Sequence, residues 1–287
     1  MHLARVVLRV PDPEAAAAFY QRVLGLGLTG RGAGGAVRLS CRPAAAVAVP
    51  DGELLLVPGS TPALEAVALA LDTAALATAV GTLHAQGHAV EGPHPAGGAG
   101  GPGLWVRDPD GLGVELGPPA PAVPRPAGAA PFELLRLGHV TRRSPDPARV
   151  ARWWQDMLGF RVSDQMGEEF VWLRCNRDHH TIAFVRAGAA GTHHIAFEAA
   201  SWDAIRRLGD HCIETGTRIE FGPGRHGPGG NIFVYLRDPW GVRWEIFCEL
   251  QRIDDEAAYR PGRWDPAQRL HTVNRWGPTP PPSFLHE

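Results

Sequence analysis

Two segments, one at the start of the chain and one near its middle, share a pattern of hydrophobic and polar positions. Residues 3–28 (LARVVLRVPDPEAAAAFYQRVLGLGL) and residues 137–162 (LGHVTRRSPDPARVARWWQDMLGFRV) each open with a short β-rich run. A Pro-Asp-Pro turn follows in both, and then an amphipathic run that ends at Leu-Gly. Apolar residues at helical spacing, closed by a glycine, are typical of a helix. The pattern therefore predicts a strand followed by a helix, twice.

The later parts of the two halves also match. Residues 104–117 (LWVRDPDGLGVELG) correspond to residues 234–247 (VYLRDPWGVRWEIF), so a unit of about 120 residues occurs twice. Within each unit we expect a strand, a helix and three short strands, and then the same order again. In the second copy the pattern predicts a strand over 193–199, a helix over 201–216 that ends at Gly216, and a hairpin over 231–247. Tandem βαβββ modules imply an α+β fold with two domains and curled, mostly antiparallel sheets.

A stretch rich in proline and alanine separates the two copies (GPPAPAVPRPAGAAP, residues 117–131). Such a stretch cannot continue a helix or a central strand, so it marks a linker. We therefore expect four parts: a non-catalytic domain over 1–117, a linker over 118–131, a catalytic metal-binding domain over 132–250 and a tail over 251–287. We expect the tail to lie over the site or a subunit contact, and the alternative is a disordered extension.

Composition excludes several kinds of function. The chain has 287 residues, a formal net charge of -2 and no lysine, so nucleic acid and acidic membranes are not expected partners. The absence of lysine also excludes Schiff-base and P-loop chemistry. The four cysteines form no C-x-x-C pair, which argues against a disulfide framework or a zinc–thiolate site. No leader and no apolar run of membrane-spanning length is evident, so we expect a soluble cytoplasmic protein.

Three residues on separate predicted strands of the second copy are candidate metal ligands. His139 lies mid-strand, His194 alternates with apolar neighbours, and Glu245 stands between Trp244 and Ile246. An ionised glutamate inside an apolar strand is costly unless it is paired or bound to a metal. Two histidines and one carboxylate match the facial triad of non-haem Fe(II) oxygenases, which leaves coordination positions open for substrate and O2.

Each of these residues also has an ordinary explanation. A single histidine in an apolar strand is usually a hydrogen-bonded core residue, and a glutamate beside a turn often points to solvent. The first copy serves as an internal control, because it has Arg5 in place of His139 and the apolar stretch 66–71 in place of His194. Only Glu115 matches Glu245. The shared fold therefore does not require the two histidines, which favours a metal site in the second copy alone.

The chain resembles the type I extradiol catechol dioxygenases of the vicinal oxygen chelate superfamily over nearly all residues up to the tail. Four motifs carry the resemblance: LGHV (137–140), NRDHHTIAF (176–184), HHIAFE (193–198) and GRHGPGGNIFVYLRDPWGVRWEIF (224–247). The resemblance implies Fe(II) as the metal, with Mn(II) as the alternative, and O2 as co-substrate. It also implies cleavage of a catechol beside one hydroxyl, a muconic semialdehyde-type product and a homo-oligomeric enzyme.

The family's functional residues map onto this sequence one by one. Its metal ligands fall on His139, His194 and Glu245. Its catalytic base falls on His180, the second histidine of the NRDHH motif, and its two other substrate-side residues fall on His226 and Tyr235. Each has an alternative reading: His179 could replace its neighbour His180 as the base, the loop histidine could be merely exposed, and the tyrosine could only pack, as Trp105 does in the first copy.

One position departs from a subgroup of the family. In homoprotocatechuate-type relatives, a basic residue five positions before the loop histidine pairs with the substrate carboxylate, whereas this chain has Phe221 there. The departure favours a neutral or aromatic-substituted catechol. Four tryptophans could enlarge an apolar pocket, although most tryptophans only pack: Trp153, Trp154, Trp172 and Trp202.

Three other functions remain open from the sequence. A glyoxalase-like metal isomerase shares the fold, but such enzymes lack the set His180, His226 and Tyr235 and often take ligands from both domains. A protein that sequesters small molecules shares the fold without needing a metal triad. A 4-hydroxyphenylpyruvate-type oxygenase shares the ligand types but normally has a longer chain.

Overall fold

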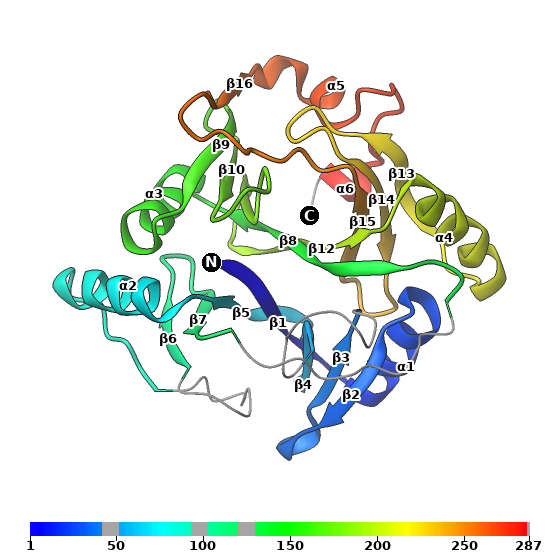
Figure 1. Ribbon diagram of the computed structural model, residues 1–287. Helices are drawn as coiled ribbons and strands as arrows, with labels where there is room; N and C mark the ends of the chain where they lie inside the picture. The colour runs from blue at the N-terminus through cyan, green and yellow to red at the C-terminus, as the bar shows by residue number, and fades with distance from the viewer. Residues whose placement is uncertain (42–51, 93–102, 120–129, 286–287) are drawn as a thin grey trace. The chain divides into compact units, whose positions relative to one another are not determined.

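The structure is a computed structural model, and it describes residues 1–41, 52–92, 103–119 and 130–285 (Figure 1). The chain divides into two compact units, Met1–Leu137 and Gly138–Glu287. Most of the predicted linker 118–131 lies outside the described residues. In the described part, no helix has both the length and the apolar character needed to cross a membrane.

The first unit is built on one seven-stranded sheet with the strand order β2-β3-β4-β1-β5-β7-β6. Its elements are β1 (His2–Val10), α1 (Pro13–Leu24), β2 (Gly27–Arg31), a 3-10 turn η1 (Ala33–Gly35), β3 (Val37–Ser40), β4 (Leu54–Pro58), β5 (Ala63–Ala70), α2 (Thr73–Ala85), β6 (Leu104–Arg107) and β7 (Gly113–Gly117).

The second unit is built on a nine-stranded sheet with the order β13-β14-β15-β12-β8-β11-β10-β9-β16. Helix α3 packs on β10 and β11, and helix α4 packs on β12 to β15, as Figure 1 shows in green and yellow. The elements are β8 (Leu134–Ser144), α3 (Pro147–Leu158), β9 (Arg161–Met166), β10 (Phe170–Arg174), β11 (Ile182–Arg186), β12 (Gly191–Ala199), α4 (Trp202–Thr215), β13 (Ile219–Arg225), β14 (Ile232–Arg237), β15 (Arg243–Cys248), β16 (Gly262–Trp264), η2 (Pro266–Gln268), α5 (Arg269–Val273) and α6 (Pro282–Leu285).

The helices begin and end where the repeated sequence pattern predicts. The aspartate of each Pro-Asp-Pro turn caps a helix, Asp12 for α1 and Asp146 for α3, by accepting hydrogen bonds from free backbone N–H groups of the first turn. Both helices close at a glycine in the left-handed conformation, which costs glycine nothing. Helix α4 ends in the same way, at Gly216.

The two closing hairpins share a register as well as a sequence. Asp238 Oδ1 accepts hydrogen bonds from the backbone N–H groups of Trp240 and Val242 at 2.9 and 2.8 Å, and Asp108 makes the corresponding bonds in the first unit. Beyond the turn, Tyr235 pairs with Glu245, and Trp105 pairs with Glu115. The predicted α+β fold of two repeated modules is therefore confirmed.

Two details differ from the pattern. In the described part of the first unit, α2 is followed by two strands rather than three, and an isolated bridge between Glu91 and Trp105 holds the segment before them. In the second unit, the tail contributes a strand of its own, because β16 pairs in parallel with the outer strand β9. This pairing depends on contacts between residues about a hundred positions apart, which no local pattern contains.

Candidate metal centre and its cavity

Three side chains on the central strands of the second sheet point their donor atoms at one another. His139 on β8, His194 on β12 and Glu245 on β15 are each at most 4% exposed. Oε2 of Glu245 lies 3.1 Å from Nε2 of His139 and 3.0 Å from Nε2 of His194. The two imidazole nitrogens are 3.4 Å apart. These are the three residues that the sequence nominates as metal ligands.

Strand order explains how residues so distant in the sequence meet. The strands β15, β12 and β8 are consecutive in the sheet, and alternate side chains of each strand point to the same face. Glycine at position 138 is also needed, because a Cβ there would lie 2.4 Å from ring carbons of Phe247, whose ring packs beside that of His139.

The donor geometry fits a metal ion. Two donor atoms that each lie about 2.1 Å from one ion are about 3.0 Å apart when the donor–ion–donor angle is a right angle, and about 3.4 Å apart when it is tetrahedral. The three observed separations fall at these two values. Nδ1 of His139 is buried with no hydrogen-bond partner in the described part of the chain, so the only polar contacts of this ring are made on the side of the triad. Two imidazoles and one carboxylate suit iron(II) and manganese(II).

Glu245 stays ionised despite its burial. Burial alone would raise the pKa of this carboxyl, but the contacts with His139 and His194 more than offset it and hold the pKa well below its usual range. Oε1 accepts a hydrogen bond from the side-chain amide of Asn231 at 2.9 Å, and Oε2 accepts one from the Tyr235 hydroxyl at 2.9 Å. Sequence reasoning did not single out Asn231, which lies within the motif 224–247, directly before β14.

His194 is held from behind by its neighbour. Burial, partly offset by the nearby Glu245, lowers the pKa of His194 to about 4, so its ring is neutral and has a lone pair to offer. Nδ1 of His194 lies 2.7 Å from Nδ1 of His193. His193 in turn hydrogen-bonds the backbone of Phe284 in the tail, and burial lowers its pKa well below the usual range. His193 thus lies outside the triad but contacts its second histidine.

Tyr235 lies on β14, next to β15, and contacts His226, which lies in the loop after β13. The hydroxyl of Tyr235 is 2.9 Å from Nε2 of His226, while Nδ1 of His226 donates to the carbonyl of Val273 at 2.6 Å. A carbonyl can only accept, so the proton on Nδ1 is fixed by the tail. Burial and the adjacent Glu245 raise the pKa of Tyr235 well above its usual range, so the phenol keeps its proton.

His180 lies on the other side of the triad. Its ring is 4.2 Å from the ring of His139, centre to centre, and it lines the same cavity as the three candidate ligands. Burial and the adjacent rings of His139 and His179 lower the pKa of His180 well below the usual range, so it is neutral and able to accept a proton. His179 is fully buried and does not line the cavity. The geometry thus favours His180 over His179 as the substrate-side histidine.

The cavity at the triad is lined by both polar and apolar side chains. All six residues nominated from the sequence line it. The apolar lining includes Phe170 and Trp172, whose rings stack 4.0 Å apart, together with Met166 and Val185. Four tail residues also line the cavity: Arg269, Thr272, Val273 and Phe284.

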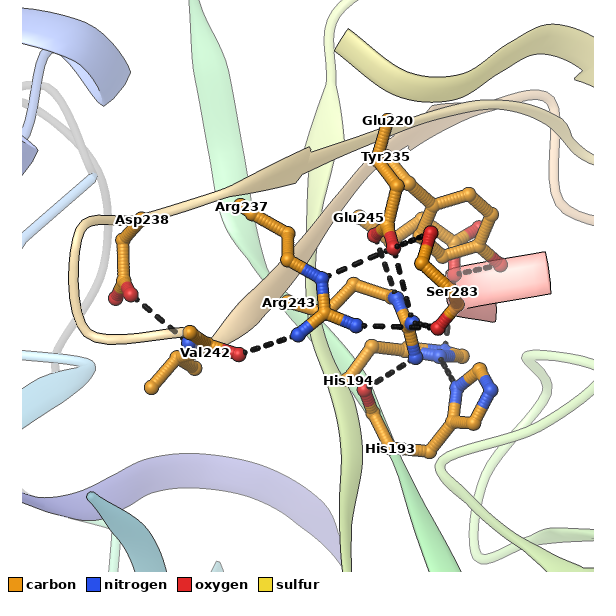
Figure 2. Close-up of polar contacts among 11 residues, drawn as sticks. His193, His194, Glu220, Tyr235, Arg237, Asp238, Val242, Arg243, Glu245 and Ser283 are labelled. Atoms are coloured by element: carbon orange, nitrogen blue, oxygen red, sulfur yellow. Dashed lines mark hydrogen bonds and ion pairs between the residues drawn. The ribbon is translucent and has the colours of Figure 1, made fainter. Parts of the chain in front are cut away.

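A charged network ties the end of the tail to the sheet beside the triad (Figure 2). Oε2 of Glu220 accepts from Arg243 Nε at 2.8 Å, and Oε1 accepts from Arg237 Nε at 2.9 Å and from the Ser283 hydroxyl at 3.0 Å. Arg243 also donates to the carbonyls of Ser283 and His193. The network places Phe284 against Tyr235 and His193.

Several residues named in the sequence analysis lie away from the cavity. Of the four tryptophans named above, only Trp172 lines the cavity, whereas Trp154 is fully buried against Phe160 and Trp202 is 41% exposed. Phe221 does not reach the cavity either, because its ring packs with Phe233 and Phe284 behind Tyr235. The basic side chain that does line the cavity, Arg269, comes from the tail and was not anticipated.

The first unit has a salt bridge in the place of this centre. Arg5 NH2 lies 2.7 Å from Oε2 of Glu115, and both side chains are buried. Ala68 pairs with Glu115 as Ala196 pairs with Glu245, so the first-unit equivalent of His194 is Ala66. An arginine compensates the buried carboxylate here, and the described part of this unit contains no cluster of metal-ligand side chains.

Comparison with known proteins agrees with this arrangement. The family model for the Glyoxalase/Bleomycin resistance protein/Dioxygenase superfamily matches residues 2–116 and again residues 136–246. The chain belongs to this superfamily. Both copies of the repeat are matched separately, as the internal sequence comparison requires.

Among curated proteins, Metapyrocatechase 2 of Cupriavidus necator is 29% identical over 204 residues, which cover 64% of this chain and 63% of that protein. The matched region thus spans less than two thirds of this relative. Homoprotocatechuate 2,3-dioxygenase of Arthrobacter globiformis is 26% identical, with a TM-score of 0.87 over 100% of this chain and 91% of that chain. A Mn(II)-bound glyoxalase from Novosphingobium aromaticivorans is 27% identical, with a TM-score of 0.87 over 100% of this chain and 94% of the other.

Replacing a proposed ligand tests the metal centre. His194→Ala removes one of three donors, so we expect affinity for Mn(II) or anaerobic Fe(II) to fall at least about 100-fold. Metal content after equilibrium dialysis measures this directly. His84→Ala, an exposed histidine on α2, is the matched control and should bind metal as the wild type does. Stoichiometric metal in His194→Ala would contradict the assignment.

The charged network predicts a dependence of stability on acid. The arginines beside Glu220 hold its pKa at about 2 against the effect of burial, compared with about 4.3 in an unfolded chain. The network therefore stabilises the fold above about pH 4.3, and this contribution disappears as the pH falls towards 2. Allowing for solvent screening, we expect roughly 1–2 kcal/mol.

In Glu220→Gln, the free energy of unfolding should fall less steeply than in the wild type between about pH 4.5 and 2. Urea unfolding at each pH measures this free energy. Glu249→Gln removes an exposed ion pair with Arg225 and serves as the control. Equal slopes in the wild type and in Glu220→Gln would show that the network contributes nothing measurable to stability.

Proposed function

We propose that this protein is a metal-dependent extradiol dioxygenase that cleaves a catechol beside one hydroxyl with both atoms of O2. The observation that carries the proposal is the cavity of the second unit, where three donors suited to iron(II) stand beside a neutral histidine and a Tyr–His pair. A glyoxalase-like isomerase needs the donors but has no evident use for that second group.

Each residue has a definite task in this reaction. His139, His194 and Glu245 would hold the metal ion. The bound metal would supply Lewis acidity and open coordination positions that bring a catechol and O2 together. Nε2 of His180 would take a proton from a substrate hydroxyl and return it later in the reaction. The Tyr235 hydroxyl and His226 would hydrogen-bond a substrate oxygen. Phe170 and Trp172 would stack against the ring, and Phe284 would limit the access of water.

Iron(II) is the metal we propose, with manganese(II) as the alternative. Both accept two imidazoles and a carboxylate and leave positions open, so the ligand set does not separate them. The likeness to a Mn(II)-bound glyoxalase supports keeping manganese in the test. It also supports keeping a glyoxalase-like isomerase as the second candidate function.

The decisive assay is oxygen uptake. Protein loaded anaerobically with Fe(II), and in parallel with Mn(II), is mixed with a panel of catechols in air. We expect a yellow product and consumption of one O2 per catechol. His194→Ala under the same conditions is the control for free metal. No uptake by metal-loaded protein across a broad panel, together with turnover of glutathione hemithioacetals, would replace the proposal with the isomerase.

Arg269, the basic side chain that lines the cavity, offers a test of the substrate class. Phe221, which stands in place of the basic residue of homoprotocatechuate-type relatives, predicts a neutral or aromatic-substituted catechol, whereas Arg269 is a cation at the cavity and could pair with a carboxylate. With a neutral substrate, Arg269→Met should leave kcat/KM within about threefold of the wild type. A loss of 100-fold or more, confined to carboxylated catechols, would contradict the neutral-substrate prediction and assign the carboxylate to Arg269.

A further inference from the structure

A chain of three buried side chains leads from the outer strand β9 to the cavity. Asp164 on β9, His179 and His180 are each at most 4% exposed. Oδ2 of Asp164 lies 3.3 Å from Nε2 of His179, an ion-pair distance, and this nitrogen makes no aligned hydrogen bond within the described residues. Nδ1 of His179 lies 3.1 Å from Nδ1 of His180, and His180 lines the cavity.

The carboxylate decides where the protons of this chain lie. An ionised carboxylate can only accept, and a lone pair on Nε2 of His179 facing it would be repelled. When the His179 ring carries a single proton, that proton is therefore on Nε2, and its Nδ1 is an acceptor. Because Nδ1 of His180 faces that acceptor, it must be the donor. A neutral imidazole has one N–H, so Nε2 of His180 is left with a lone pair.

Asp164 is built to remain ionised and fixed in place. Its carboxylate accepts the backbone N–H of Gly262 at 2.7 Å and the indole N–H of Trp264 at 2.7 Å. Burial would raise its pKa, but His179 and these donors outweigh burial and lower the pKa. His179 is fixed from its other side, since its backbone N–H donates to the carbonyl of Gln251 at 2.9 Å and Gly229 packs against its ring.

We propose that Asp164 and His179 are positioning residues that hold His180 as the tautomer with its proton on Nδ1, so that Nε2 can act as the base. The inference rests on the proposed function for its catalytic meaning, but the tautomer itself is a property of the folded chain. With the opposite tautomer, His180 would present an N–H to the cavity and could not accept a substrate proton.

A purely structural role for Asp164 would make a different prediction. Asp164 also anchors β16, so its replacement could act only by loosening the tail. Trp264→Phe separates the two roles, because it removes a hydrogen bond between the tail and Asp164 but leaves the carboxylate facing His179.

The tautomer can be observed without any turnover. In full-length protein labelled with 15N-histidine and loaded with diamagnetic Zn(II), the protonated and unprotonated ring nitrogens resonate far apart. His180→Gln identifies the signals of this ring. We expect the proton on Nδ1 in the wild type and in Trp264→Phe, and on Nε2 or exchanging between both nitrogens in Asp164→Asn. A wild-type His180 protonated on Nε2 would overturn the proposal, as would an unchanged tautomer in Asp164→Asn.

A double-mutant cycle tests whether the pair acts through His180. We expect Asp164→Asn and His180→Gln each to lower kcat about 100-fold. Combined, they should lower it no further than His180→Gln alone, within about threefold, because the base is already absent. Effects that multiply would assign Asp164 a structural role only. If the wild type consumes no O2, the proposed function fails, while the NMR measurement still decides the tautomer.

Discussion

The second unit is organised around one buried negative charge. Glu245 lies on a central strand with its carboxylate 1% exposed, and removing such a charge from water is costly unless other groups compensate it. Two imidazoles, a phenol and an amide do so: the imidazoles come from β8 and β12, and the phenol and the amide come from β14 and the residue before it. The same strand position in the first unit carries Glu115, which is compensated by Arg5 instead.

This difference shows how one repeated fold supports two roles. A buried carboxylate on β7 or β15 is a feature of both units, and the fold accepts either an arginine or a set of metal donors opposite it. With arginine, the carboxylate is held in a buried salt bridge. With two histidines, the donor set is suited to an ion, and the adjoining cavity gives a substrate access to it.

The tail completes this site chemically as well as sterically. The carbonyl of Val273 fixes the proton of His226, the backbone of Phe284 bonds His193 behind His194, and Gly262 with Trp264 holds the carboxylate that faces His179. Histidine has two nitrogens and, when neutral, one proton, so a base or a ligand works only if its second nitrogen is directed. In each case a tail residue takes part in giving that direction.

The sequence by itself determined the repeat, the helices with their caps, the α+β fold and the three residues that meet at the metal centre. These features depend on local periodicity, on turn chemistry and on comparison between the two copies, all of which are present in the linear chain. Only the tertiary structure decided that Arg269 rather than Phe221 lines the cavity, that β16 joins the sheet, and that Asp164 faces His179. Two of these features arise from the packing of the tail on the sheet, and the third joins residues 15 positions apart; such tertiary contacts leave no periodic trace in the sequence.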